Sequence, residues 1–450
     1  MSSRRDRLWR AFLWIFAMIG TAVLMVLSSC VYERAESGPN QAHDKEEPEK
    51  VQLVVWGWGA AVEGLNLNME DFRAEYPHID VQFQSINNSE LYQKFLVAAN
   101  TRDEIPDVVV LETSNLAQMV SIGALYDITD RVSPYFERMN AFKWADAMMD
   151  DRIYAMPWDT GPVVMFYRPR LFEQAGLPSD PDEVARTVRT FADYAHAGEM
   201  IKRHTDAYLL SDSMHRSNNR FFETMMWQQG LWYFDKEGRV ILDSPEVIAI
   251  GQYMVSLFEN GYVYPAEPWS DRWIEAITSG RVATIVGASW YDNVLPIWLD
   301  PESAGEWAVA PMPLWSEHDP YKSANDGGSN LAINAHTRYP EEAWQFIEFM
   351  LGRESSQLKM MKEGGFFPSL ETTYNDLVFS EPLPYYGGQP VRKLFVEAVQ
   401  SIYPQAYTAD FPLANELMAD AFARVFLNDE PVEQVFKETA DTLRSRTGRW

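Results

Sequence analysis

The stretch VQLVVWGWG, residues 51–59, decides the fold, because it reads as a mainly apolar strand over 51–56 followed by a glycine-rich turn. Working outward, apolar residues at helical spacing over 65–76 predict a helix that Pro77 stops. Alternating apolar residues over 79–83 predict a second strand, and the apolar run 107–111 predicts a third. Strand alternating with helix indicates a parallel sheet covered by helices.

The same alternation resumes further along the chain. Further strands are predicted at 163–167, 282–286, 307–311 and 331–334, and further helices after Arg168, Asp243, Ser270 and Pro340. From Pro390 onward the sequence is almost wholly helical. The predicted fold class is therefore α/β, with two lobes and a helical end.

The N-terminal segment has the pattern of a secretory signal. Four Arg and one Asp occur in the first ten residues, followed by the apolar run AFLWIFAMIGTAVLMVL. The run ends in Leu-Ser-Ser-Cys, which resembles the lipobox of bacterial lipoproteins and makes Cys30, the sole cysteine, the lipidated residue. We therefore expect a signal peptide over 1–29, palmitate on Cys30, and a flexible tether over 30–50, in which residues 33–50 carry no aliphatic side chain larger than that of alanine. The alternative is an uncleaved anchor helix with an incidental cysteine.

Charge and motifs exclude several functions. A net charge of −27 repels phosphates, so nucleic acid and anionic lipids are not expected as ligands. No G-x-G-x-x-G or P-loop occurs, the seven His form no close pair, and Gly287-Ala-Ser-Trp-Tyr291 lacks the closing glycine of a nucleophile elbow. We expect no catalytic residue, metal ion or cofactor.

Tryptophans recur beside short polar residues at predicted strand ends and loops. The stretches are WGWG from Trp56, PWDTG around Trp158, SWYDN around Trp290, and the tryptophan-free DGGSN from Asp326. Ligands of open α/β sheets bind beyond the carboxyl ends of strands. Indole faces stack on the apolar face of a pyranose, while carboxylates and amides bond its hydroxyl groups. Core packing is the alternative for each tryptophan, and Trp344 on its amphipathic helix is expected in the core.

Several motifs in order resemble one family. They are LVVWGW, IPDVVVL, IGALYDITD, YAMPWDTGPVVMFYR, GRVATIVGASW, WAVAPMP, GGSNLAIN and EEAWQFIEFML, preceded by the lipobox and an acidic tether. Together they resemble the family 1 extracellular solute-binding proteins, the sugar-binding subunits of ATP-binding-cassette (ABC) importers related to maltose-binding protein. The resemblance covers Val51 to the C-terminus.

This resemblance implies a two-lobed, type II periplasmic-binding-protein-like fold with a multi-segment hinge. Lobe one would comprise 51–160 plus 305–338, and lobe two 162–303 plus 340–450. The hinge would lie near residues 159–161, Pro301 and residues 338–340.

The resemblance also implies a substrate-binding site. Its candidate residues are Trp56, Trp58, Glu63, Glu112, Asn115, Trp158, Asp159, Trp290, Asp292, Gly327 and Gly328. The contacts of the maltose-binding relatives are not reproduced residue for residue, so maltose is not expected. Many tryptophans and no basic cluster favour a neutral saccharide over a phosphate or uronate, and the resemblance implies an oligosaccharide.

The implied function is a lipid-anchored, monomeric, non-enzymatic binding protein on the outer face of the bacterial cell membrane, which delivers its sugar to an ABC permease. One alternative is a surface glycosidase, which needs two carboxyl groups flanking the scissile bond. Its candidates are Glu63, Glu112, Asp159, Asp292 and Asp326. A lectin-like adhesin without a transporter is a further alternative.

Overall fold

The computed structural model describes residues 50–213, 219–405 and 407–450. The predicted signal peptide, the lipidation site Cys30 and the predicted tether up to residue 49 lie outside the described residues. Within the described part of the chain, no helix has both the length and the apolar character needed to cross a membrane.

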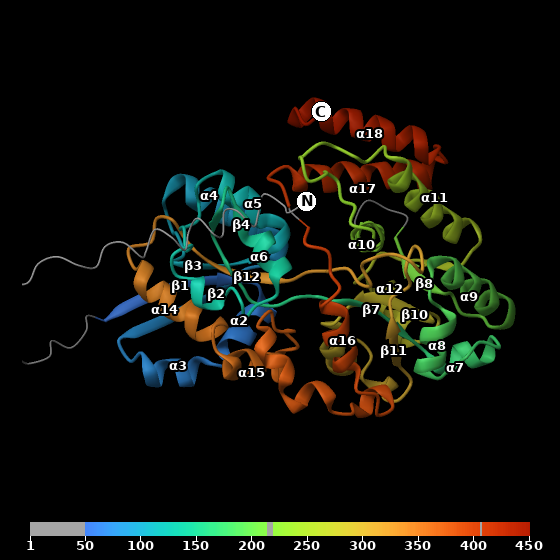
Figure 1. Ribbon diagram of the computed structural model, residues 1–450, viewed down its shortest axis with the longest axis horizontal. Helices are drawn as coiled ribbons and strands as arrows, with labels where there is room; N and C mark the ends of the chain where they lie inside the picture. The colour runs from blue at the N-terminus through green and yellow to red at the C-terminus, as the bar shows by residue number, and fades with distance from the viewer. Residues whose placement is uncertain (1–49, 214–218, 406) are drawn as a thin grey trace, which may run out of the picture. The chain divides into compact units, whose positions relative to one another are not determined.

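The first sheet begins with the strands that the sequence predicts. Its order is β2-β1-β3-β12-β6. The strands are β1 (Val51–Gly57), β2 (Ile79–Ser85), β3 (Val108–Glu112), β12 (Ser329–Ile333) and β6 (Met156–Pro157). β1 pairs in parallel with β2 and β3, whereas β12 runs antiparallel to β3 and β6 (Figure 1). The predicted parallel sheet is thus confirmed for β1, β2 and β3, whereas β12 runs in the opposite direction and β6, beyond it, runs in the same direction as the first three strands.

Helices cover this sheet and enclose the first core. They are α2 (Gly59–Asn66), α3 (Met69–Glu75), α4 (Asn88–Thr101), α5 (Thr113–Ser121), α6 (Ala141–Ala147), α14 (Pro340–Leu351) and α15 (Glu354–Gly364). A hairpin of β4 (Met148–Met149) and β5 (Arg152–Ile153) follows α6. The single helix predicted ahead of Pro77 is divided into α2 and α3 at Leu67 and Asn68, and the side-chain amide of Asn68 donates to the Ser356 carbonyl.

The second sheet repeats the order of the first. β10 (Thr284–Ala288) and β11 (Ala308–Pro311) flank β7 (Val163–Tyr167), both antiparallel to it. Beyond β10, Tyr208 and Val282 form a parallel bridge that leads to the parallel pair β8 (Leu210–Asp212) and β9 (Val263–Pro265). The resulting order β9-β8-β10-β7-β11 matches β2-β1-β3-β12-β6 in strand direction.

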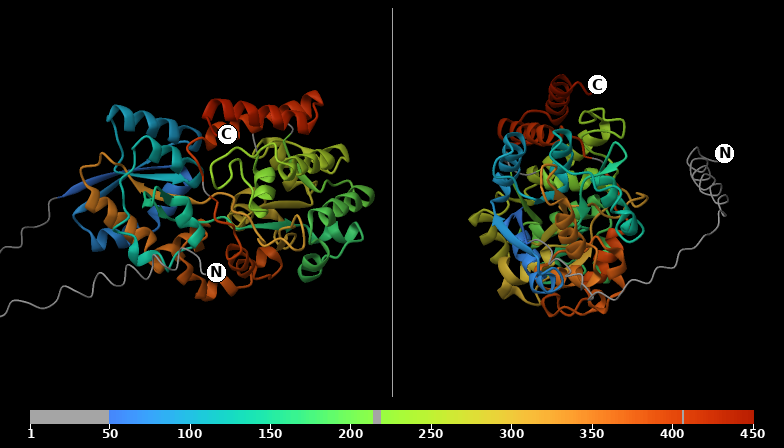
Figure 2. Two further views of the ribbon diagram at one scale, coloured as in Figure 1. Left: turned by 45° about the horizontal axis from the view of Figure 1, so that its top comes forward. Right: turned by 90° about the vertical axis from the view of Figure 1, so that its left-hand side faces the viewer.

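The remaining helices pack in the second core (Figures 1 and 2). They are α7 (Pro169–Gln174), α8 (Pro181–Thr187), α9 (Phe191–His204), α10 (Arg220–Gln228), α11 (Pro245–Glu259), α12 (Asp271–Thr278), α13 (Tyr291–Val294), α16 (Val391–Val399), α17 (Phe411–Asn428) and α18 (Val432–Thr447). Short turns are η1 (Ser133–Tyr135), η2 (Leu295–Leu299), η3 (Pro301–Ser303), η4 (Glu371–Asn375), η5 (Leu377–Ser380) and η6 (Pro384–Tyr386). The predicted start of α11 is confirmed, since the Ser244 hydroxyl accepts from the Val247 amide.

Parts of two segments pack in the lobe opposite to the one expected, whereas β12 and the helices α16 to α18 lie in the expected lobes. Residues 305–338 were expected in lobe one, but β11 pairs with β7 and therefore belongs to the second sheet. Residues 340–450 were expected in lobe two, but α14 and α15 bury Phe346, Ile347 and Met360 in the first core. Apolar runs and amphipathic stripes show that a segment is buried, but they carry no information about which of two cores buries it.

Three segments join the two cores. Residues 158–163 form the central one, with residues 324–329 hydrogen-bonded along one edge and residues 367–369 along the other. The expected hinge positions near Pro301 and residues 338–340 are not among them. Leu299, beside Pro301, packs in the second core, and Tyr339 packs against the first.

Replacing Gly161 with alanine tests this three-segment junction. A Cβ atom there would overlap the main-chain carbonyl of Asp326, so the two segments would have to separate. We expect a loss of roughly 1–3 kcal/mol of unfolding free energy in a urea melt.

Gly59→Ala is the matched control, because a Cβ atom there meets only the Ser85 hydroxyl at 3.9 Å. It lies in the first turn of α2, where alanine favours the helix, so stability should be unchanged or slightly raised. Equal stability of the two variants would contradict the tight junction.

Candidate functional site

A cavity of about 520 Å³ lies where strands of both sheets end. The carboxyl ends of β3, β8 and β10 all open onto it, as ligand sites of α/β sheets do. The lining residues are Glu112, Leu210, Ser211, Asp212, Arg220, Phe221, Glu267, Pro268, Trp269, Trp273, Ile277, Thr284, Ile285, Val286, Gly287, Trp290, Tyr291, Asp326 and Gly327.

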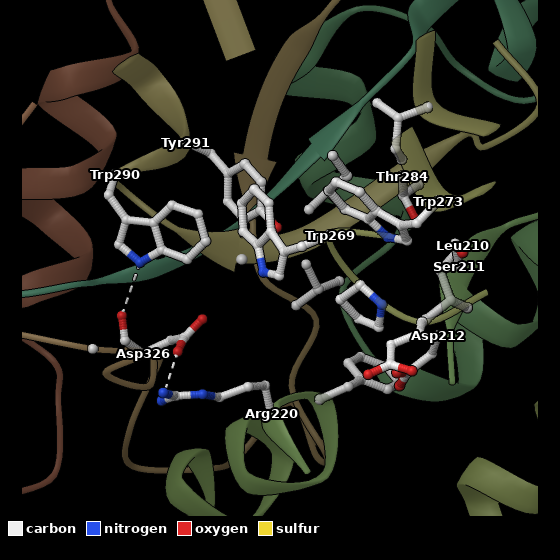
Figure 3. A pocket seen from close by; sticks show the side chains of 18 of the residues that line it. Leu210, Ser211, Asp212, Arg220, Trp269, Trp273, Thr284, Trp290, Tyr291 and Asp326 are labelled. Atoms are coloured by element: carbon white, nitrogen blue, oxygen red, sulfur yellow. Dashed lines mark hydrogen bonds and ion pairs between the residues drawn. The ribbon is translucent and has the colours of Figure 1, made fainter. Parts of the chain in front are cut away.

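Aromatic rings form one wall of the cavity (Figure 3). Trp290 and Tyr291, which follow β10, stack with ring centroids 4.1 Å apart. Trp269 lies parallel to Tyr291 at 6.0 Å, and its ring centroid is 5.1 Å from that of Trp273 on α12. This wall offers flat apolar faces to a ligand, because Trp290 is only half-buried and Trp269 is 45% exposed.

An ion pair faces this wall from the other side of the cavity (Figure 3). Arg220, the first residue of α10, lies 3.1 Å from the Asp326 carboxylate. The main-chain carbonyl of Asp326 accepts a hydrogen bond of 3.1 Å from the Trp290 indole nitrogen. Burial raises the pKa of Asp326, while Arg220 acts in the opposite direction. Asp326 in the segment 324–329 therefore contacts both sides of the cavity, Arg220 through its side chain and Trp290 through its main chain.

Asp212, the last residue of β8, lines the cavity at a distance from Trp290 (Figure 3). Its residue is 4% exposed, and its Oδ1 atom accepts a 2.7 Å hydrogen bond from the Ser213 amide. Its Oδ2 atom has no hydrogen-bond partner among the described residues. Burial raises the pKa of Asp212 to about 7. Such an oxygen is a ready acceptor for a ligand hydroxyl.

Glu112 reaches the cavity from the first core. It is the last residue of β3, and its Oε1 atom accepts a 2.9 Å hydrogen bond from the Asn88 amide. Its main-chain N–H donates to the Tyr92 hydroxyl at 3.4 Å. Glu112 is therefore oriented by α4 while the other described side chains of the lining come from the second core and from residues 324–329.

Two glycines allow the segment with Asp326 to pass close behind the cavity. Gly327 and Gly328 have φ of +97° and +94°, in the left-handed region that favours glycine. A Cβ atom on Gly328 would lie 2.9 Å from the buried Lys143 ammonium, whose nitrogen donates to the Thr113 hydroxyl at 2.7 Å. A side chain at Gly328 would push the segment away from its neighbours, whereas at Gly327, where a Cβ atom would meet only Trp290 Nε1 at 3.6 Å, the backbone conformation alone favours glycine.

Three of the predicted site residues line the cavity, namely Glu112, Trp290 and Gly327. Trp56 and Trp158 were expected there as well, but their side chains lie in the first core. Both are 1% exposed; Lys94 lies over the Trp56 ring, and Trp158 stacks on Phe366 at 4.4 Å.

The other predicted residues do not line the cavity. Trp58 packs half-buried against the first core, Glu63 is exposed on α2, and Asn115 donates to the Ser114 hydroxyl. The remaining three have structural neighbours: Asp159 accepts from the Ser329 amide at 2.7 Å, Asp292 pairs with Arg392 at 2.8 Å, and Gly328 lies beside Lys143.

Sequence reasoning missed Asp212, Arg220, Trp269 and Trp273. Trp269 precedes the capped start of α12, where the Ser270 hydroxyl accepts from the Trp273 amide. The sequence signal for Trp269 and Trp273 is that both flank the start of a helix that follows a strand, β9. Ligands of α/β sheets bind beyond the carboxyl ends of strands, so residues in the loop after a strand are candidates for the site. Asp212 ends a strand of three residues, which is too short for a recognisable apolar pattern.

Comparison with known proteins identifies the class. Residues 69–382 match the family model described as bacterial extracellular solute-binding protein. The arabinooligosaccharide-binding protein of Halalkalibacterium halodurans is 22% identical over 413 residues, covering 88% of this chain and 89% of the relative. The lactose-binding protein of Rhizobium radiobacter is 22% identical over 405 residues, covering 87% and 92%.

A solved structure of a family 1 extracellular solute-binding protein superposes with a TM-score of 0.77. It is 23% identical and covers 87% of this chain and 99% of that chain. The chain therefore belongs to the bacterial extracellular solute-binding proteins, whose members are binding proteins that act outside the cytoplasm, and it has their two-lobed fold.

Asp212→Asn should change how stability depends on pH. Because burial raises the folded-state pKa to about 7, the cost of the buried charge is absent below about pH 4 and complete above about pH 7. Wild-type stability therefore falls as pH rises through this window, and the asparagine variant should escape the fall. Urea melts should show a relative gain of roughly 2–4 kcal/mol for the variant near pH 8 compared with pH 4.

Asp206→Asn is the control, since Asp206 is exposed and precedes the same strand. It should follow the wild-type pH profile. An identical profile for Asp212→Asn would show that the Asp212 carboxyl is not desolvated.

Proposed function

We propose that the cavity binds a carbohydrate, specifically an oligosaccharide, and that the protein delivers it to an ABC permease. The observation that carries this proposal is the aromatic wall of Trp290, Tyr291 and Trp269 facing polar groups across one cavity. A sugar ring has the same two-sided character, with an apolar C–H face and a rim of hydroxyl groups. The names of the two sugar-binding relatives point to the same class of ligand.

The contacts available are sufficient for useful affinity. A micromolar dissociation constant corresponds to about −8 kcal/mol. Hydrogen bonds to charged groups contribute about 1.5–3 kcal/mol each, and Asp212, Asp326 and Arg220 offer several. Arg220 is already paired with Asp326, so the cavity presents no unpaired cation among its described lining residues that would favour a phosphate or a uronate.

Binding would couple to movement of the lobes about the three connecting segments. A ligand favours the closed arrangement only to the extent that it makes more contacts there than in the open one. Glu112 from the first core and Trp290 from the second line the same cavity, so one ligand could contact both cores.

We further propose that the protein is a monomer held at the outer face of the cell membrane by lipid on Cys30 after removal of residues 1–29. The support is the sequence: a basic start, an apolar run, and Leu-Ser-Ser ahead of the sole cysteine. This places the cavity outside the cell, where a permease could receive the sugar.

Trp290→Ala should weaken binding of the best saccharide from a thermal-shift screen by at least about tenfold, or about 1.4 kcal/mol. The change removes a stacking face from the cavity wall, and the fold should stay intact because Trp290 is only half-buried. Affinity is measured by calorimetry and stability by urea melt on the same sample.

Trp344→Ala is the matched control, because Trp344 is 7% exposed in the first core and does not line the cavity. It should lose roughly 3–5 kcal/mol of stability with affinity kept in the folded fraction. The reverse outcome for Trp290, with stability lost and affinity unchanged, would contradict the proposed site.

The glycosidase alternative makes a different chemical prediction. Of its five candidate carboxylates, Glu112 and Asp326 line the cavity, and Asp326 is paired with Arg220. A binding protein returns the saccharide unchanged after long incubation. New reducing ends that disappear in Glu112→Gln would reassign the protein to the glycosidases.

Cys30→Ala should abolish incorporation of labelled palmitate and release the protein into the medium, or leave it held by its uncleaved signal segment alone. The measurement is membrane fractionation with labelled lipid. Ser29→Ala is the control, since it keeps a small residue before the cysteine and should leave lipidation unchanged. Undiminished lipid label in Cys30→Ala would overturn the lipoprotein proposal.

A further inference from the structure

Aromatic surface continues beyond the cavity. Trp298 is 60% exposed and is not part of the cavity lining, yet its ring centroid lies 5.8 Å from that of Trp269. Trp269 in turn lies 5.8 Å from Trp290. The three indoles therefore form a row that begins inside the cavity and ends on the protein surface.

The backbone at Trp269 is held in an unfavourable conformation. Its φ is +70°, and a bulky residue rarely adopts this region. The turn is fixed by Ser270, whose hydroxyl donates to the Glu267 carbonyl at 2.6 Å and accepts from the Trp273 amide. Core packing does not explain the strain, because Trp269 is 45% exposed. Strained residues of this kind concentrate at binding sites.

Trp298 is displayed by a π-helical turn. In η2, Leu295 and Leu299 are buried while Ile297 and Trp298 between them are 67% and 60% exposed. π-helical turns occur frequently at functional sites. Large apolar side chains that lie together on a surface usually mark a place of interaction, since leaving them in water costs free energy.

We propose that Trp298 is an additional sugar-stacking subsite at the mouth of the cavity, so that an oligosaccharide extends from Trp290 past Trp269 onto Trp298. This inference rests on the proposed function. The subsite would make affinity depend on the length of the saccharide. A disaccharide would occupy the cavity alone, and a longer chain would gain the contact with Trp298. The continuity of the aromatic row with the cavity favours a ligand that enters the cavity over a protein that docks on the surface.

The test compares short and long ligands in matched variants. The probes are size-fractionated arabino-oligosaccharides and galacto-oligosaccharides, each from disaccharide to hexasaccharide, titrated by calorimetry. Wild type should bind the best hexasaccharide more tightly than its disaccharide. Trp298→Ala should weaken hexasaccharide binding by roughly fivefold and leave the disaccharide unchanged. Trp298→Phe, which keeps a flat face, should restore part of the loss.

Two controls fix the interpretation. Trp290→Ala should weaken both lengths, because it removes a face inside the cavity. Trp450→Ala, at a tryptophan that is 73% exposed and does not line the cavity, should weaken neither. Far-ultraviolet circular dichroism and urea melts establish that Trp298→Ala is folded, as expected for an exposed side chain.

The outcomes separate this subsite from the proposed function. Equal affinity of wild type and Trp298→Ala for every length, with sugar binding otherwise present, overturns the subsite and leaves the proposed function standing. Normal binding of all lengths combined with loss of uptake in cells also overturns it and makes Trp298 a contact for the permease. No binding of any saccharide by wild type overturns the proposed function itself.

Discussion

Residues 158–163 are hydrogen-bonded through the main chain along both edges, and most of the architecture depends on this constraint. The Trp158 N–H donates to the Ser329 carbonyl on one side, and the Trp158 carbonyl accepts from the Ser369 N–H on the other, while the Thr160 N–H donates to the Phe367 carbonyl. The segment begins in the first core and ends in the second. Because residues 324–329 are paired to it, Asp326 is held at the junction of the lobes. The hinge and one side of the cavity are thus the same segment of chain.

A buried lysine supports this arrangement from behind. Lys143 is fully buried, and burial lowers the pKa of its ammonium group while Asp146 and Asp159 act in the opposite direction. Burying a charge is costly unless opposite charges and hydrogen bonds lie close by, and Thr113 and Asp159 connect the lysine to both the first sheet and the hinge. The close approach of Lys143 to Gly328 leaves no room for a Cβ atom at this position.

The sequence predicts individual helices and strands better than it predicts which strand or core each of them packs against. β1, β3 and the start of α11 could be located because apolar periodicity and capping act over a few residues. The lobe of β11 could not, since pairing with β7 joins residues far apart in sequence. The same limit applies to the site. Trp158 and Trp290 both lie near strand ends beside polar residues. The Trp158 ring is covered by Phe366, however, whereas the Trp290 ring lines the cavity. Which face a strand-end residue occupies depends on one step of register.

The two lobes contribute unequally to the cavity lining, and this bears on how a bound ligand could change the arrangement of the lobes. Its aromatic wall and Asp212 belong to the second lobe, and Asp326 belongs to the hinge. A ligand that contacted only these groups would bind open and closed arrangements equally, and would shift no equilibrium between them. Among the described lining residues, Glu112 is the one contributed by the first lobe. Asn88 and Tyr92 orient it from α4, so its position follows the first lobe as a rigid unit. Of the groups that line this cavity, Glu112 is therefore the one whose contacts with a ligand would favour one arrangement of the lobes over another, whereas the aromatic wall would contribute equally to the affinity of either.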